Sequence, residues 1–211
     1  MATKDKIMKE YMEFELLNGR APHSVFELTK KLKIEESEFY QQFANLDSIR
    51  QAILKDLIDK TLAILDVDPD YNGYSTREQL LALYYTLFEQ MKAKRSYLLT
   101  KYKDIIRMAE HGKDWKPFLG ALVERASDIM RNGRETEEIK DRPLVGNHYG
   151  KGAPVVFFYI FRVWVNDASE DFADTDAAIE KAINTGLDLL GGNPLESLFD
   201  FGKFAFKTKL F

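Results

Sequence analysis

Large apolar residues recur every three or four positions along most of the chain, which is the spacing of one face of an α-helix. The clearest example is the series Ile7, Tyr11, Phe14 and Leu17, which predicts an amphipathic helix of about four turns. Alternating apolar and polar positions, which are typical of a half-buried strand, are scarce. The pattern therefore predicts an all-α protein.

The N-terminal part of the chain carries signals for the start and end of four helices. The first helix is expected to end at Gly19, a residue suited to the left-handed backbone that often follows a helix. Ser24 opens a capping box at the start of the second helix, and the third is expected over 36–43. Asn45 is the predicted N-cap of a long fourth helix over about 47–65.

The segment 66–75 contains a Pro, a Gly, an Asn and three Asp, so it predicts a loop and a domain boundary. Residues 1–46 would then form one domain, the helix over 47–65 a connection, and residues 66–211 a second domain. Further helices are expected over 76–92, 96–110, 113–131, 153–166 and 175–190, with an irregular segment over 132–152 and an amphipathic tail over 195–211.

Composition excludes several classes of protein. The chain has no Cys, which rules out disulfides, thiolate metal sites and a Cys nucleophile. The three His lack the spacing of metal ligands, and no arrangement of catalytic groups is found, so we expect no metal, no cofactor and no enzymatic activity. No signal peptide or membrane-spanning apolar run is found either, which favours a cytoplasmic protein.

The order of the N-terminal signals is more specific than any one of them. Helices two and three, joined by a turn of about four residues, have the spacing of a helix-turn-helix. In chain order, the features are Gly19, the capped segment 24–28, Lys33-Ile34, the aromatic segment 39–43 and the capped segment 45–49. With these features in register, residues 5–60 resemble the N-terminal region of the TetR family of bacterial regulators.

The resemblance implies a ligand-responsive transcriptional repressor. Such a protein is a homodimer whose third helices enter successive major grooves of double-stranded DNA, while its helical body binds a small apolar or amphipathic ligand. Tyr40 matches the tyrosine with which the family contacts phosphate, and Gln41 and Gln42 suit adenine edges or phosphates. The predicted DNA-contacting residues are Ser24, Lys30, Lys31, Lys33, Glu38, Tyr40, Gln41 and Gln42.

The charge of this region departs from the family pattern. Leu46 stands where the family usually has a lysine, and no Lys or Arg occurs over 34–48. Residues 1–65 hold 10 Lys and Arg against 11 Asp and Glu, although phosphate contacts supply most nonspecific affinity for DNA. Two alternatives stay open: a regulator that binds operator DNA, and a protein that keeps the helix-turn-helix but binds DNA poorly or not at all.

The remainder of the chain is rich in aromatic residues. Aromatic residues at helical spacing usually form a core, but large aromatic walls with few charges are also typical of a pocket for an apolar ligand. Arg162 either pairs with a carboxylate or meets the acidic head group of a ligand. The predicted ligand-binding residues are Tyr84, Phe88, Tyr102, Trp115, Phe118, Phe158, Phe161 and Arg162.

Two C-terminal features point to further contacts. The expected helices over 153–166 and 175–190 resemble in position the family's dimer interface. Within the tail over 195–211, the stretch 199–211 mixes five Phe and one Leu with three Lys, as in helices that lie in a membrane interface. The tail either packs on the body or makes peripheral membrane contact. The second alternative favours a lipid- or isoprenoid-binding protein that keeps the TetR fold without operator binding.

Overall fold

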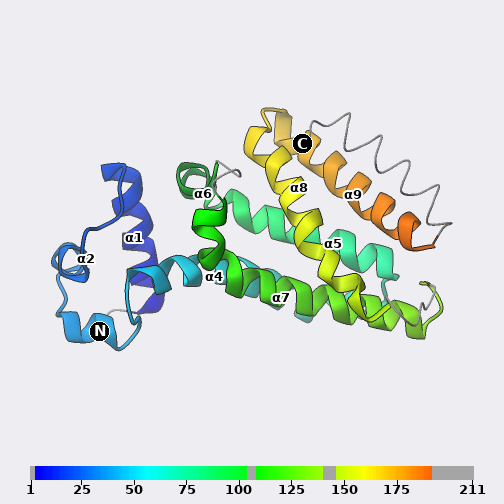
Figure 1. Cartoon of the computed structure of the whole chain (residues 1–211), viewed down its shortest axis with the longest axis horizontal. Helices are drawn as coiled ribbons and strands as arrows, with labels where there is room; N and C mark the ends of the chain where they lie inside the picture. Colours follow the sequence, from blue (N-terminus) through cyan, green and yellow to red (C-terminus); the bar gives the residue numbers. More distant parts are fainter. Residues whose placement is uncertain (1–2, 104–107, 140–145, 192–211) are drawn as a thin grey trace. The chain divides into compact units, whose positions relative to one another are not determined.

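The computed structural model describes residues 3–103, 108–139 and 146–191 (Figure 1). Every regular element in these ranges is a helix, so the prediction of an all-α protein is confirmed. The chain forms two compact units, which we call unit 1 (residues 1–62 and 87–121) and unit 2 (residues 63–86 and 122–211). These units are defined by packing. The predicted division into a DNA-binding domain over residues 1–46 and a ligand-binding domain over residues 66–211 concerns function and stays a prediction.

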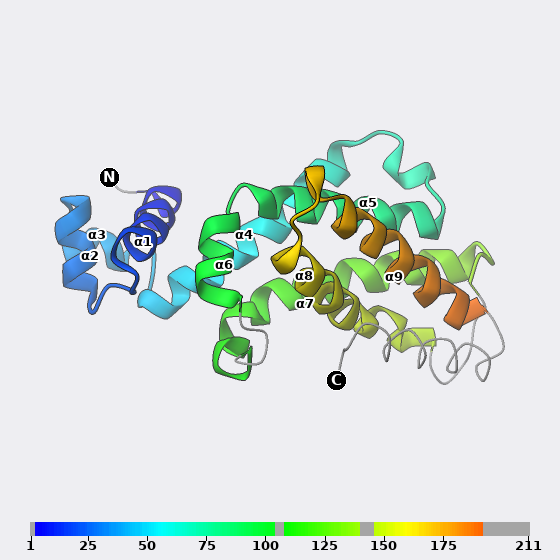
Figure 2. The same cartoon turned by 90° about the horizontal axis from the view of Figure 1, so that it is seen from above.

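Unit 1 contains the three N-terminal helices, which gather closely in Figure 2. Its elements are α1 (Lys4–Asn18), α2 (Val25–Leu32), α3 (Glu36–Tyr40), α6 (Arg95–Tyr102), most of α4 (Leu46–Val67) and parts of α5 (Thr76–Lys92) and α7 (Met108–Glu135). Helix α1 contacts both α2 and α6, and α2 contacts α3. The apolar stripe that predicted the first helix supplies buried residues to this core, among them Ile7, Tyr11 and Phe14.

The local signals at the helix ends act as predicted, with one difference. Gly19 has a φ of 65° and its N–H donates to the carbonyl of Glu15 over 2.9 Å. The Ser24 hydroxyl accepts from the N–H of Glu27 over 3.2 Å, but the Glu27 carboxylate accepts from the N–H of His23 instead of that of Ser24. The Asn45 side chain accepts from the N–H of Ser48 over 2.8 Å, so Asn45 caps α4 as expected.

Unit 2 contains the C-terminal helices. Its elements are the remaining parts of α4, α5 and α7, the 3-10 helices η1 (Tyr71–Gly73), η3 (Gly146–Gly152) and η4 (Glu170–Phe172), and the helices α8 (Ala153–Asn166) and α9 (Ala173–Gly191). Helices α8 and α9 lie side by side (Figure 1, Figure 2). The buried Asp167 carboxylate accepts hydrogen bonds from the backbone and side chains of Ser169 and Thr175, which fixes the link between these two helices.

Several of the predicted element boundaries are wrong. Helix α3 ends at Tyr40 and not at residue 43, because the N–H of Gln42 donates to the carbonyl of Phe39 in a tighter turn. The helix predicted over 96–110 ends at Tyr102, and α7 then runs through the break expected near residue 112. Gly112 inside a helix costs only about 1 kcal/mol, which packing elsewhere in α7 offsets. Part of the segment expected to be irregular, 132–152, is helical as well.

Gly150 lets η3 lie directly against α7. A Cβ atom at this position would lie 2.6 Å from the Cα and amide nitrogen of Ser127, whereas a Cβ at Gly152 would meet nothing within 4 Å. We therefore expect Gly150→Ala to lower the free energy of unfolding by about 1–3 kcal/mol through overpacking. Gly152→Ala, in the same 3-10 helix, should change it by less than about 0.5 kcal/mol. Urea unfolding of both variants followed by circular dichroism checks this, and equal stability of the two would contradict it.

Candidate functional site

The turn between α2 and α3 is built on a lysine in the left-handed conformation. Lys33 has φ 56° and ψ 47°, and its N–H donates to the carbonyl of Lys30, while the N–H of Ile34 donates to that of Thr29 over 3.1 Å. These two bonds form a Schellman motif, which usually places glycine at the left-handed position. The backbone therefore reverses directly after α2, and a cationic side chain projects from the turn.

A small apolar core holds α2 and α3 together. Leu28 and Phe39 are fully buried, and Leu32 and Phe43 are nearly so. Phe39 also contacts the rings of Tyr40 and Phe43, with centroid distances of 5.4 and 6.1 Å. Because the buried residues occupy one side of these short segments, their other side is left for the polar residues that the sequence predicts to contact DNA.

The structure places most of the predicted DNA-contacting residues on the surface. Lys30, Lys31, Lys33 and Gln41 are exposed, and Tyr40 is 53% exposed although its ring packs edge-on against Phe39. The other members serve partly in structure. Ser24 is exposed but its hydroxyl caps α2, Glu38 and Gln42 are half-buried, and Gln41 and Gln42 lie just beyond the end of α3.

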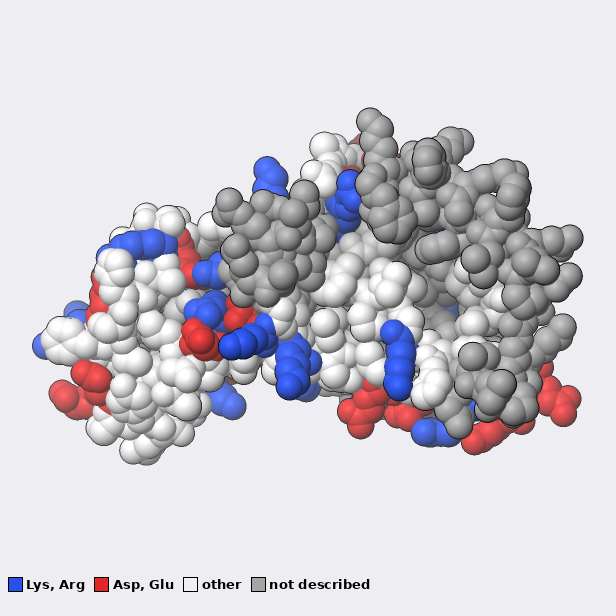
Figure 3. All heavy atoms as spheres, in the orientation of Figure 1, with Lys and Arg blue, Asp and Glu red and all other residues white. Residues whose placement is uncertain are grey.

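The charge of unit 1 differs in sign from that of its N-terminal segment. Residues 1–62 and 87–121 together hold 18 Lys and Arg against 15 Asp and Glu, because the second of these ranges is rich in lysine. Unit 2 has the opposite balance, with 12 against 19. On the face drawn in Figure 3, basic and acidic side chains of the described residues are interspersed. A count over residues 1–65 alone therefore understates the positive charge of the unit that carries the helix-turn-helix.

A buried polar network in unit 1 ties α1 to three other helices. The Arg50 guanidinium on α4 donates to Asp114 on α7 over 3.1 Å and to the hydroxyl of Tyr11 on α1 over 3.4 Å. Lys101 on α6 donates to the Glu15 carboxylate on α1 over 2.8 Å. Burial raises the pKa of Tyr11 to about 12, so its hydroxyl stays neutral throughout the physiological pH range.

Several residues predicted to bind ligand belong to the core around this network. Tyr102, Trp115 and Phe118 are almost completely buried, with ring centroids 5.1 Å apart for the first pair and 5.2 Å for the second. The Tyr102 hydroxyl donates to Asp114 over 3.2 Å. Phe88, also buried, belongs to unit 1 as well. Their positions suit packing, so their predicted role in ligand binding stays a prediction without support from a cavity.

Unit 2 contains an apolar cavity of about 210 Å³. Its wall is formed by residues of α5, α7, η3, α8 and α9. None of these lining residues carries a charge. Tyr84 is the predicted ligand residue that lines it, with its hydroxyl donating to the carbonyl of Ala153 over 2.8 Å. The lining residues are Leu80, Tyr84, Ala126, Met130, Tyr149, Gly150, Gly152, Ala153, Val156, Ala182, Ile183, Gly186, Leu187, Leu189 and Leu190.

The other predicted ligand residues on α8 lie outside this wall. Phe161 is fully buried and stacks between Phe157 and Trp164, with both centroid distances 5.7 Å. Phe158 is half-buried against Phe157. Arg162 is exposed, and no ion pair to it occurs among the described residues. The aromatic stripe of α8 thus mainly supplies core packing.

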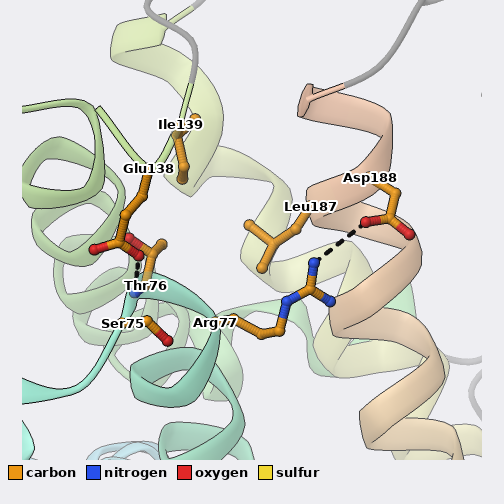
Figure 4. A pocket seen from close by; sticks show the side chains of 7 residues that line it. All are labelled: Ser75, Thr76, Arg77, Glu138, Ile139, Leu187 and Asp188. Atoms are coloured by element: carbon orange, nitrogen blue, oxygen red, sulfur yellow. Dashed lines mark hydrogen bonds and ion pairs between the residues drawn. The ribbon is translucent and has the colours of Figure 1, made fainter. Parts of the chain in front are cut away.

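A second cleft of about 580 Å³, lined by both polar and apolar side chains, adjoins the cavity, since Leu187 lines both. Figure 4 shows Leu187 between two polar groups. On one side, the Glu138 carboxylate accepts from the N–H of Thr76 over 2.7 Å. On the other, Arg77 reaches from α5 to α9, where it donates to Asn184 and pairs with Asp188.

Most of the cavity wall was not predicted from the sequence, because that wall is made of small and aliphatic residues. Ala182 and Gly186 lie one turn apart on α9, and an added Cβ at Gly186 would meet nothing within 4 Å. Small residues at i and i+4 on one helix face are the available signal. Their distance in sequence from Tyr84 concealed that they share a cavity with it.

No cluster of His, Cys, Asp and Glu suited to a metal ion is found among the described residues. Among the helices of the same ranges, none combines the length and apolar character needed to cross a membrane. The predicted membrane contact of residues 195–211 lies outside the described residues.

Comparisons with known proteins give one match. A family model described as "Tetracyclin repressor-like, C-terminal domain" matches residues 79–205, which is more than half of the chain. No curated protein and no solved structure matches significantly. The match covers the helices that line the cavity of unit 2, whereas the resemblance found from the sequence motifs lies in the N-terminal region.

Titration of the Glu27 carboxylate tests the ion pair and the hydrogen bond that the structure shows at the start of α2. The Arg20 guanidinium, at 2.7 Å, and the N–H of His23 lower the pKa of Glu27 to about 2. A carboxylate with a lowered pKa stabilises the folded state above its ordinary value near 4.5, and this contribution is lost as the pH falls from there toward 2. We expect Arg20→Gln to raise the pKa of Glu27 toward 4.5, measured from the NMR shift of its carboxyl carbon. An unchanged pKa would exclude the ion pair in solution.

Proposed function

The chain belongs to the tetracyclin repressor-like family of regulators, and on that premise we propose that it is a ligand-responsive transcriptional repressor that binds double-stranded DNA as a homodimer. The observation that carries the proposal is the helix-turn-helix formed by α2 and α3, with exposed Lys30, Lys31, Lys33 and Tyr40 on its surface. The proposed role requires access to DNA, which agrees with the cytoplasmic location expected from the sequence.

Two kinds of DNA contact divide among these residues. The lysines at the end of α2 and in the turn provide positive charge for phosphate contacts, which position a protein on the duplex without reading its sequence. Tyr40 and Gln41, at and just beyond the end of α3, supply a hydroxyl and an amide for phosphates or base edges. The acidic residues of α3 complement the helix dipole but add no affinity for phosphate.

Dimerisation is proposed through α8 and α9. The exposed side of α8 carries Val155, which is 66% exposed, and the half-buried Tyr159 and Val163 one and two turns later. An apolar stripe of this kind on the surface of a protomer is typical of the core of a subunit interface. Two copies of the helix-turn-helix in one dimer would contact two half-sites of the operator.

The ligand response is proposed to act through the cavity of unit 2. A ligand that fills it would contact α5, α7, α8 and α9 together and would stabilise the arrangement of these helices to which it binds best. If that arrangement differs from the one that fits the operator, ligand binding lowers DNA affinity by linkage. The alternative of a lipid-binding protein without operator binding is favoured by the acidic α3 and by Leu46 at the start of α4, and the tail that also favoured it lies outside the described residues.

Gel retardation with genomic DNA fragments at increasing salt tests the DNA proposal. If three lysines per protomer contact phosphates, a dimer makes about six contacts, and log Kobs should fall against log salt with a slope of about −5. Lys31→Gln removes one contact per protomer and should reduce the steepness of this slope by about 2. Lys60→Gln is the control, because Lys60 is an exposed lysine of unit 1 on α4 that pairs with Asp56. Absence of specific retardation at low salt would reject operator binding.

A further inference from the structure

We propose that the cavity of unit 2, together with the adjoining cleft, binds a cationic amphiphile: an apolar chain fills the cavity and a single positive head group lies in the cleft. The inference rests on the proposed ligand site and names the chemical class of its ligand. Two observations carry it. Leu187 lines both spaces, and the cavity has no charged lining residue whereas the lining of the cleft has a net negative charge.

The wall of the cavity sets the apolar part of the ligand. No charged side chain lines it, and the polar group of Tyr84 is already bonded to a backbone carbonyl. A charged group inside would be left without a partner, at a large cost. The cavity of about 210 Å³ leaves room for a short alkyl chain.

The cavity and the cleft follow one another along the same two helices. On α5, Thr76 and Arg77 line the cleft, and Leu80 and Tyr84 line the cavity one and two turns later. On α9, Leu187 lines both spaces. A molecule that is apolar at one end and polar at the other can therefore place each end in a matching environment.

Charge determines the sign of the head group. The residues that line the cleft include two carboxylates, Glu138 and Asp188, against one guanidinium, Arg77. Because Arg77 pairs with Asp188, these two charges offset each other, and the carboxylate of Glu138 gives the lining its net negative charge. Unit 2 as a whole holds 12 Lys and Arg against 19 Asp and Glu, which attracts cations toward it and repels anions.

Three probes with the same chain separate the head-group classes: octylammonium, octanol and octanoate. Isothermal titration calorimetry of the full-length protein without DNA should give the tightest binding for octylammonium and the weakest for octanoate. Shortening the alkylammonium chain should weaken binding about fourfold per methylene up to the capacity of the cavity. Octanoate binding as tightly as octylammonium, or no binding of any probe, would overturn the proposal.

Two cleft variants should change affinity in opposite directions. Glu138→Gln keeps an acceptor for the N–H of Thr76 but removes a negative charge, so it should weaken octylammonium binding about two- to fivefold. Arg77→Gln leaves the carboxylates uncompensated and should strengthen it by a similar factor. Octanol binding should not change in either variant. Arg131→Gln, which removes an exposed arginine paired with Asp128 outside the cleft, is the control. Weaker octylammonium binding in both cleft variants would indicate a merely structural role and overturn the proposal.

The position of the chain is tested from inside the cavity. Gly186→Leu places a side chain into the open space and should abolish binding of all three probes, while the gain in helix propensity keeps the protein folded. Gly120→Leu is the matched control, because Gly120 lies in α7, is equally unobstructed and does not line the cavity. Unchanged binding in Gly186→Leu would overturn the proposal. Failure of the DNA retardation experiment with intact octylammonium binding would reject the regulator and retain this ligand site.

Discussion

The Arg50 guanidinium is the interaction on which the arrangement of unit 1 depends. Its side chain is 19% exposed and is bonded at once to Asp47, Asp114 and Tyr11, so one charged group joins helices from the beginning and the middle of the chain. A buried charge of this kind is tolerated only when its partners are in place, and loss of one partner typically costs about 3–5 kcal/mol. Hydrogen bonds as well as apolar contacts therefore fix how α1, α4 and α7 pack in the unit that carries the helix-turn-helix.

Those parts of the fold that depend on neighbouring residues were predictable from the sequence. Gly19 and Asn45 mark helix ends because each acts on its own backbone or on that of the next turn, which needs no distant partner. The end of α3 and the course of α7 through Gly112 were not predictable. There the outcome depends on how the segment packs, and a glycine or a short turn gives the same local signal in a helix and outside it.

The proposed DNA-contacting surface and the proposed ligand cavity differ in how far the sequence could predict them. The residues expected to contact DNA are nearly contiguous in the chain, so Lys30, Lys31 and Tyr40 could be chosen before any coordinates were known. The cavity combines five elements and is lined largely by small and aliphatic side chains, whereas the conspicuous aromatic residues Tyr102 and Trp115 fill a core instead. Large aromatic side chains in a sequence therefore indicate core packing more reliably than they indicate a ligand site. Space for a ligand arises where side chains are small, and that is visible only once the walls are assembled.

The open space over Gly186 allows stability and the size of the ligand site to change independently, although these two properties usually oppose each other. Binding sites are commonly paid for in stability, since groups suited to a ligand are poorly suited to the fold. Replacing Gly186 by a larger helix-forming residue would stabilise the helix. The larger the new side chain, from alanine upward, the shorter the molecule that still fits into the cavity. If the cavity holds the proposed ligand, a single substitution at this position would change the ligand preference without a compensating change elsewhere, which makes Gly186 a natural starting point for redirecting the protein toward smaller ligands.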